Sequence, residues 1–215
     1  FRQMIVLLGV LSIVTVLVGN FTALWQQNVK RLLAYSTIAH VGILLMGIID
    51  LRDVKIVHLA FYLATYTLMT FGAFLVIEMV ARNFKDEENP YALKHYAGLG
   101  TQAPLVGVCM VILMIALTGL PPTVGFQAKL FIFSGLWENY QAQGFSVYLW
   151  ALIAGIFTPA VSLFYYLRIP FLMFLRTGES RKITFSRFDQ VLLVIFSVAV
   201  LLLFFKADWL FEWLQ

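Results

Sequence analysis

A hydrophobic segment covers about residues 103–137 and is interrupted near its centre by two adjacent prolines, Pro121 and Pro122. As a straight α-helix this segment would be roughly 50 Å long, whereas the hydrocarbon core of a bilayer is only about 30 Å thick. Proline has no amide hydrogen, and its ring crowds the carbonyl four residues back, here at Leu117 and Thr118. The segment therefore predicts a membrane helix broken into two half-helices near mid-membrane, which is tolerated only beside protein or a water-filled cavity.

Lys129 follows this break by about two helical turns. Its neighbours on a helix are Gly125, Phe126, Ile132 and Phe133, so no nearby side chain in the sequence pairs with it. A lysine at the centre of a bilayer costs about 3 kcal/mol to insert, which favours a functional role. Because burial disfavours the charged ammonium, we expect Lys129 to take up and release protons, with Gly125 leaving room for water. The alternative is a lysine that snorkels to the membrane surface.

The composition is that of a polytopic membrane protein. Of 215 residues, 61% are hydrophobic and 12% are charged, where a soluble domain carries about 25% charge. The single cysteine, Cys109, excludes an internal disulfide, and its apolar neighbours predict simple packing. The three histidines lack the spacing of a metal site, and we expect neither a metal nor a nucleotide cofactor on this chain. The net charge of +4 lies mostly in short loops, where membrane topology explains it without nucleic acid.

Hydropathy predicts an all-α fold: a single membrane domain over residues 1–215, with about six transmembrane helices of which one is broken by proline. The expected segments cover about residues 4–25, 32–49, 56–81, 103–137, 145–175 and 191–210. The chain begins at Phe1, directly in a membrane segment and with no visible signal peptide, so we expect it to be part of a longer chain.

Lysines and arginines in the loops predict the orientation of these segments. One side of the predicted membrane holds nine of them: Lys30, Arg31, Arg82, Lys85, Lys94, Arg176, Arg181, Lys182 and Arg187. The other side holds four: Arg2, Arg52, Lys55 and Lys206. The richer side is expected to be cytoplasmic, which places both ends of the chain on the non-cytoplasmic side.

The second segment has an unusual density of polar groups for a membrane helix. These are Tyr35, Ser36, Thr37 and His40, with Ser36 and His40 four residues apart on one face. His40 falls near mid-membrane, and histidine titrates near neutral pH, so we interpret it as a proton relay supported by Ser36. The alternative is a neutral histidine bonded to a backbone carbonyl or a serine. Lys30, at the entrance, is either a topology anchor or part of proton uptake.

The third segment carries polar residues at three- and four-residue spacing: His58, Tyr62, Thr65 or Tyr66, and Thr70. This face either lines water or bonds to neighbouring helices through its hydroxyls. We take Tyr62 and Tyr66 as residues that support the histidine site. Glu78, near the cytoplasmic end, is expected to form an interfacial pair with Arg82 four residues later.

The remaining segments offer fewer functional signals. In the long polar loop after the third segment, we expect a short interfacial piece and a solvated His95, and the loop is suited to contact a partner subunit. The fifth segment contains two prolines and should kink or emerge near Arg168, with Tyr165 and Tyr166 as interface anchors. The sixth is almost purely apolar and should face lipid or a neighbouring helix, followed by an aromatic belt of tryptophans.

Five stretches together resemble one family. They read NVKRLLAYSTIAHVGILLMGI, FYLATYTLMTFGAF, YAGLGTQAPLVGVCM, LTGLPPTVGFQAKLFIF and FYYLRIPFLMF. They are similar to the C-terminal part of subunit N of bacterial NADH-quinone oxidoreductase, respiratory complex I, and the match covers nearly the whole chain in order. The KRLLAYSTIAH stretch and the PPTVGFQAK break also resemble the wider antiporter-like family, which includes multisubunit cation/proton antiporters.

The resemblance implies a subunit of a proton-translocating NADH:quinone oxidoreductase in a bacterial inner membrane. The six segments would be the last six of fourteen helices, so that this chain carries the exit half of a proton path. By resemblance, Lys129 matches the lysine of the second broken helix and His40 the histidine that links to it. NADH, FMN, iron–sulfur clusters and quinone would reside on other subunits, and this chain would meet other membrane subunits, lipid, water and protons.

Two other functions stay open at this point. A cation/proton antiporter subunit would use the same helices for sodium, but a hard cation needs several oxygen ligands, and Glu78 is the only carboxylate expected near membrane depth. A membrane scaffold that only holds partner subunits would not need Lys129 or His40. The free energy required to bury these two side chains argues against a scaffold.

Overall fold

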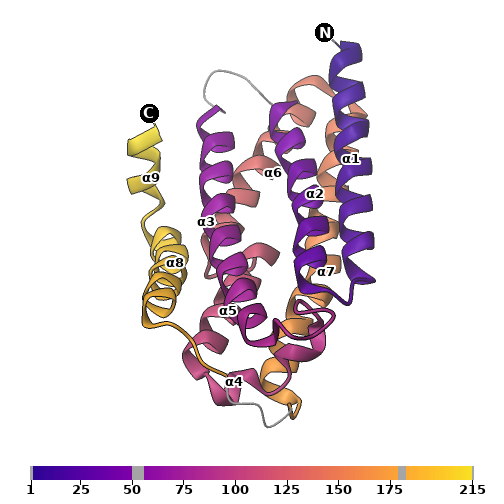
Figure 1. The fold of residues 1–215 in the computed structure, drawn as a ribbon. Coiled ribbons are helices and arrows are strands. Elements are labelled where there is room, and N and C mark those ends of the chain that lie inside the picture. Colours follow the sequence, from indigo (N-terminus) through magenta and orange to yellow (C-terminus); the bar gives the residue numbers. More distant parts are fainter. Residues whose placement is uncertain (1, 50–55, 179–182, 215) are drawn as a thin grey trace.

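The computed structural model describes residues 2–49, 56–178 and 183–214, and regular structure there is helical. The longer helices are α1 (Arg2–Leu24), α2 (Val29–Ile48), α3 (Ile56–Ala81), α5 (Pro104–Thr118), α6 (Val124–Gln143), α7 (Ser146–Leu175) and α8 (Arg187–Phe205). The short ones are η1 (Arg82–Phe84), η2 (Leu93–Tyr96), α4 (Leu99–Gln102) and α9 (Ala207–Leu214). Figure 1 shows the long helices standing side by side as a bundle, with α8 at one edge.

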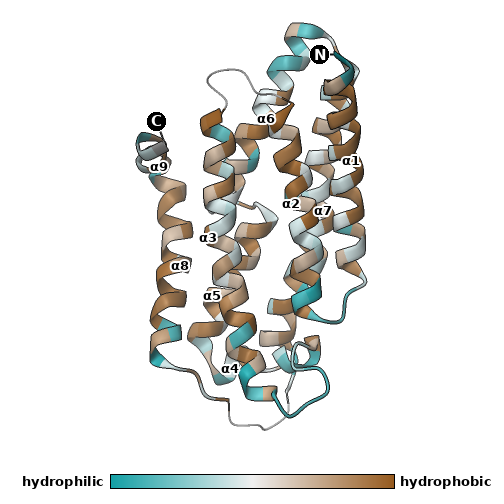
Figure 2. Cartoon of the chain, turned by 45° about the horizontal axis from the view of Figure 1, so that its top comes forward, coloured by the Kyte–Doolittle hydropathy of each residue, from teal (hydrophilic) through white to brown (hydrophobic). Residues whose placement is uncertain are grey.

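Five helices in the described chain are long and apolar enough to cross a membrane: α1, α2, α3 with its η1 extension, α7 and α8. The sixth crossing is made by α5 and α6 together, since α5 is apolar but too short on its own. Hydrophobic residues line the lengths of the helices, and hydrophilic residues gather at the two ends (Figure 2). The predicted fold, a bundle of about six membrane segments with one broken helix, is confirmed.

The two ends of the chain lie at the same end of the bundle (Figure 1), as an even number of crossings requires. The described basic residues of the richer group lie in the polar loop or next to the ends of α2, α3, α7 and α8 that point to the opposite end of the bundle (Figure 1). Arg52, Lys55, Arg181 and Lys182, which also entered the orientation argument, lie outside the described residues.

The polar loop after α3 folds back beneath the bundle and pairs with the start of α2. The Val29 amide donates to the Tyr91 carbonyl, and the Leu93 amide donates to the Gln27 carbonyl, both at 2.9 Å. His95 was expected to be solvated, and this is wrong. Its side chain is only 3% exposed, since it stacks on Phe84 at 4.0 Å and its Nε2 lies 2.9 Å from the Asn89 carbonyl.

Helix α8 packs against α3, α5 and α6, while much of its surface stays exposed, as predicted for a lipid-facing segment. Its first turn is tied to η1, which follows α3 directly, by an ion pair of 2.7 Å between Arg82 and Asp189. Asn83 adds two hydrogen bonds to the backbone of Thr184. These polar contacts hold the N-terminus of α8 in place, where large hydrophobic side chains such as Phe188 and Val191 are exposed.

Candidate functional site

The broken helix ends and restarts where the prolines predict. Helix α5 ends at Thr118, and Gly119 follows in the left-handed conformation with φ 84°, a position that favours glycine. Helix α6 begins at Val124, after a turn that holds the cis Pro121–Pro122 peptide. A helix end leaves its last four carbonyls without amide partners inside the helix. The break therefore presents free backbone carbonyls in the interior of the bundle.

Lys129 satisfies two of these carbonyls. Its Nζ donates to the carbonyl of Leu117 at 3.1 Å and to that of Thr118 at 2.6 Å. These carbonyls belong to the last two residues of α5, where the helix ends, so the break creates the partners of the lysine. Lys129 is 6% exposed, which rules out the snorkelling alternative. The sequence predicted a buried lysine without a side-chain partner, and it missed that the backbone across the break would supply two.

Gly119, and not Gly125, makes room for the lysine. A methyl group at Gly119 would lie 2.7 Å from Cδ and 3.0 Å from Nζ of Lys129. At Gly125 a methyl group would meet the Ala116 carbonyl, so this glycine lets α6 approach α5 closely. The expectation that Gly125 leaves room for water is therefore wrong, because backbone fills the space.

His40 is 4% exposed and lies between two tyrosine hydroxyls. Its Nδ1 is 2.8 Å from Tyr62 Oη, and its Nε2 is 3.3 Å from Tyr166 Oη. The Tyr66 ring stacks on the imidazole at 4.5 Å, and the Tyr66 hydroxyl donates to Thr37 at 2.9 Å. Both ring nitrogens thus face groups that can either donate or accept a hydrogen bond.

The tyrosines of α7 were expected to be interface anchors, and this is wrong. Tyr166 is fully buried against His40, and Tyr165 donates to Oδ1 of Asn20 on α1 at 2.9 Å. A signal for this face was available in the sequence. Ser162 follows Thr158 by four residues, and the two tyrosines follow Ser162 by three and four, which marks a polar stripe along one side of a helix.

A small cavity connects the lysine and the histidine. Its lining residues come from five helices: Asn20, Ala39, His40, Ile43, Leu117, Lys129, Thr158, Pro159, Ser162 and Tyr165. The volume open to the centre of a water-sized sphere is about 10 Å³, close to the room that one water molecule needs. The bundle thus brings the two predicted site residues to the same small cavity, which is lined by both polar and apolar side chains.

The other predicted residues divide between the surroundings of this site and the end of the bundle opposite the chain termini. Tyr62 and Tyr66 bond to α2, which favours the reading in which this face of α3 contacts a neighbouring helix. Ser36 is buried, and its hydroxyl donates to the Leu33 carbonyl of its own helix. His58, on the same helix as the tyrosines, stacks on Phe131 at 5.0 Å.

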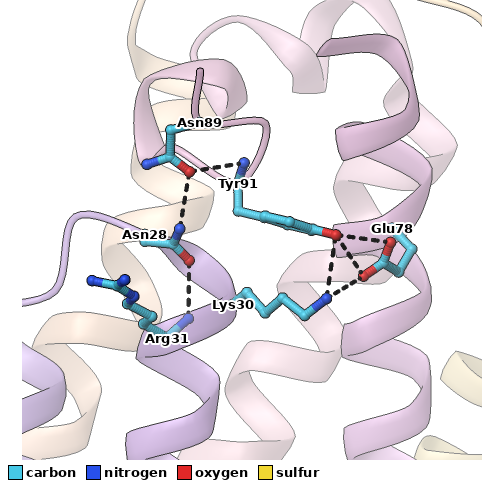
Figure 3. A network of polar contacts seen from close by, with 6 residues as sticks. All are labelled: Asn28, Lys30, Arg31, Glu78, Asn89 and Tyr91. Carbon is cyan, nitrogen blue, oxygen red and sulfur yellow. Dashed lines mark hydrogen bonds and ion pairs between the residues drawn. The ribbon is translucent and has the colours of Figure 1, made fainter. Parts of the chain in front are cut away.

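Lys30 lies in a separate polar network (Figure 3). Its Nζ is 2.9 Å from Glu78 Oε1 and 3.2 Å from the hydroxyl of Tyr91, which also bonds to Glu78. The predicted pair of Glu78 with Arg82 is therefore wrong, because Lys30 of α2 takes the carboxylate and Arg82 pairs with Asp189. The described residues contain no group of three side chains suited to hold a metal ion.

Comparison with known proteins gives one consistent result. A family model described as NADH:quinone oxidoreductase/Mrp antiporter, TM, matches residues 2–158. The chain is 45% identical over 175 residues to NADH-quinone oxidoreductase subunit N 2 of Chloroherpeton thalassium, covering 81% of this chain and 32% of the relative. It is 38% identical over 196 residues to subunit N of an Anaeromyxobacter species, covering 90% of this chain and 37% of the relative. The chain thus spans about a third of the length of these curated relatives.

Solved structures share the fold. A chain of respiratory complex I from Thermus thermophilus with bound aureothin superposes with a TM-score of 0.79 at 31% identity, covering 95% of this chain and 44% of that one. A chain of an archaeal membrane-bound sulfane sulfur reductase superposes with a TM-score of 0.85 at 22% identity, covering 99% and 41%. The second likeness extends to the fold alone.

Proposed function

Because the chain belongs to the NADH:quinone oxidoreductase/Mrp antiporter family of membrane subunits, we propose that it is part of a complex I subunit N and carries the outlet half of a proton path. Its relatives are named as subunits of an enzyme complex. In this proposal the chain contributes to a translocase, while NADH, FMN, iron–sulfur clusters and quinone are bound by other subunits.

The observation that carries the proposal is the contact of Lys129 with the carbonyls of Leu117 and Thr118. A neutral amine has two N–H groups and a lone pair, whereas an ammonium has three N–H groups. Two carbonyls therefore satisfy both N–H groups of the neutral amine, and they leave one N–H of the ammonium for another acceptor. A water in the adjoining cavity would donate to the lone pair or accept the third N–H. The site is thus suited to both protonation states without rearrangement.

His40 supplies the group that precedes Lys129 on the proposed path. When Tyr166 donates to Nε2, the Nδ1–H of the neutral imidazole donates to Tyr62, and the opposite tautomer reverses both bonds. A proton that arrives at one ring nitrogen can therefore leave from the other. We expect His40 to pass protons through the cavity to Lys129, which releases them toward the end of the bundle that holds both chain termini.

The proposal includes the setting of the subunit. We expect a bacterial inner membrane, with the lysine- and arginine-rich end in the cytoplasm and both ends of this chain on the other side. Other membrane subunits and lipid would surround the apolar outer faces of helices such as α1 and α7, which expose many large hydrophobic side chains.

The test is Lys129→Ala in the complete complex, measured as proton pumping per NADH oxidised in membrane vesicles. Lys85→Ala, in an exposed loop, is the matched control for loss of a positive charge. We expect Lys129→Ala to abolish pumping in an assembled complex, while the control pumps normally. Unchanged pumping by Lys129→Ala would favour the scaffold, and pumping that requires sodium would favour a cation antiporter.

A further inference from the structure

The position of Lys129 depends on how two separate half-helices meet. The amine is carried by α6, whereas its two carbonyl partners belong to the end of α5. Only the turn of residues 119–123 joins the two pieces. Because a hydrogen bond weakens steeply with distance, a small shift of α6 along or away from α5 would separate the amine from its acceptors.

A second set of contacts holds α6 from the opposite side. Gln127 and Phe131 lie one helical turn apart, and each is two residues from Lys129. At about 100° per residue, this places them roughly 200° around the helix from the lysine. Both contact the C-terminal part of the chain, where α8 gives way to α9 at Lys206.

The contact of Gln127 is a hydrogen bond to a helix end. Its Nε2 donates at 2.8 Å to the carbonyl of Phe204, in the last turn of α8. Carbonyls in the last turn have no amide partner within their own helix, so the glutamine caps α8 as Lys129 caps α5. The Oε1 of Gln127 is buried and makes no hydrogen bond within the described chain. Within the described chain, Gln127 therefore acts as a hydrogen-bond donor through its side-chain amide N–H.

The contact of Phe131 is aromatic. Phe211 of α9 packs against it edge to face at 5.1 Å and stacks on Phe61 of α3 at 4.7 Å. Phe61 is fully buried and precedes Tyr62, which bonds to His40. The C-terminal segment thus contacts α6 on the side away from Lys129, and it contacts α3 at the residue next to Tyr62, the partner of His40.

From these contacts we propose that Gln127 is a positioning residue for Lys129: by capping α8, and together with Phe211, it holds α6 against the end of α5. This inference rests on the proposed proton-transfer role of Lys129. According to this inference, the α8–α9 junction affects proton transfer indirectly, through the position of α6 and not through contact with the Lys129 amine. On one face of α6 the Gln127 amide donates to the end of α8, and on the other face the Lys129 amine donates to the end of α5. Helix α6 is thus held between two helix ends.

The test is Gln127→Met, which keeps the length of the side chain and removes one hydrogen bond. Gln141→Met is the matched control, because Gln141 is exposed on the same helix. In the complete complex we expect Gln127→Met to lower pumping per NADH oxidised by about tenfold, below the hundredfold loss that a 1 Å misplacement can cause. A structural role alone would not change the pH at which pumping is half-maximal, whereas displacement of the amine from its carbonyls would.

Phe211→Ala serves as the second variant, because it loosens the same helix without touching Gln127. We expect it to shift the pH profile in the same direction as Gln127→Met. The inference is overturned, and the proposed function stands, if Lys129→Ala stops pumping while both variants match Gln141→Met in rate and pH profile. Normal pumping by Lys129→Ala overturns the proposed function and this inference together.

Discussion

Two lysines of this chain have opposite surroundings. Lys129 is buried in the bundle, and its hydrogen bonds go to the carbonyls of Leu117 and Thr118. The side chain of Lys30 is 48% exposed and pairs with the Glu78 carboxylate, while its Nζ lies 4.4 Å above the Tyr91 ring (Figure 3). The same side-chain type thus meets neutral acceptors at one site and a full negative charge at the other.

The difference between these partners decides what each lysine can do. A carboxylate and an aromatic face both attract an ammonium and offer little to a neutral amine. Carbonyl oxygens accept hydrogen bonds from either form. We therefore interpret Lys30 as a fixed charge that joins α2, α3 and the polar loop, and Lys129 as a group that can change its charge in place.

The sharpest way to break this comparison is to place a permanent charge at each position. Arginine stays protonated in proteins, so Lys129→Arg keeps the N–H donors but cannot release a proton. We expect pumping per NADH oxidised to fall by about a hundredfold, within the range lost with a positioned proton carrier. Lys30→Arg should pump normally, since its ion pair survives. Substantial pumping by Lys129→Arg would mean that this side chain need not deprotonate.

A somewhat smaller effect is expected from Gly119→Ala. The left-handed conformation costs an alanine about 1–2 kcal/mol, and the new methyl group would also displace the Lys129 side chain. We expect pumping to fall about tenfold, because misplacement of a reacting group by a fraction of an ångström slows the step that it takes part in. Gly144→Ala is the control, because Gly144 has a similar φ of 66° and the described chain places nothing within 4 Å of the added methyl group. Equal pumping by the two variants would show that the space around the lysine is unimportant.

Loss of one hydroxyl at the histidine should have a milder effect. Tyr166→Phe keeps the ring and removes the hydrogen-bond partner of His40 Nε2. One such bond is worth about 1 kcal/mol, so we expect pumping to fall roughly fivefold. Tyr140→Phe is the control, because Tyr140 lies eleven residues beyond Lys129 on α6, about 16 Å along the helix from the proposed site. A Tyr166→Phe variant that pumps like this control would remove Tyr166 from the proposed path.

Much of the fold, and the burial of Lys129 and His40, could be predicted from the sequence. Segment length and hydropathy predict six crossings, and proline chemistry predicts the break at Pro121 and Pro122. Lys129 and His40 stand out because polar groups at membrane depth are unfavourable without a role. These are properties of single segments, which one-dimensional patterns describe well.

Most of the partners could not be predicted, because they come from other helices. Tyr166 is 126 residues from His40, and Lys30 is 48 residues from Glu78. Helical periodicity gives the polar face of a segment but not the helix that it meets. The α7 tyrosines resembled interface anchors for that reason. The carbonyl partners of Lys129 were missed for another reason. Proline chemistry predicts that the carbonyls of Leu117 and Thr118 lose their helical amide partners, but it does not predict which side chain donates to them.

The smallest effect is expected at the polar end. In Glu78→Gln the ion pair with Lys30 is lost, but an exposed pair of this kind contributes only about 0.5 kcal/mol. The backbone hydrogen bonds from Val29 to Tyr91 and from Leu93 to Gln27 remain, so the loop should stay in place. We expect normal pumping and only slightly faster amide hydrogen exchange in the loop, a difference that high salt should reduce. If Glu78→Gln instead stopped pumping in an assembled complex, Lys30 would belong to proton uptake, and the division between a fixed and a titrating lysine would fail.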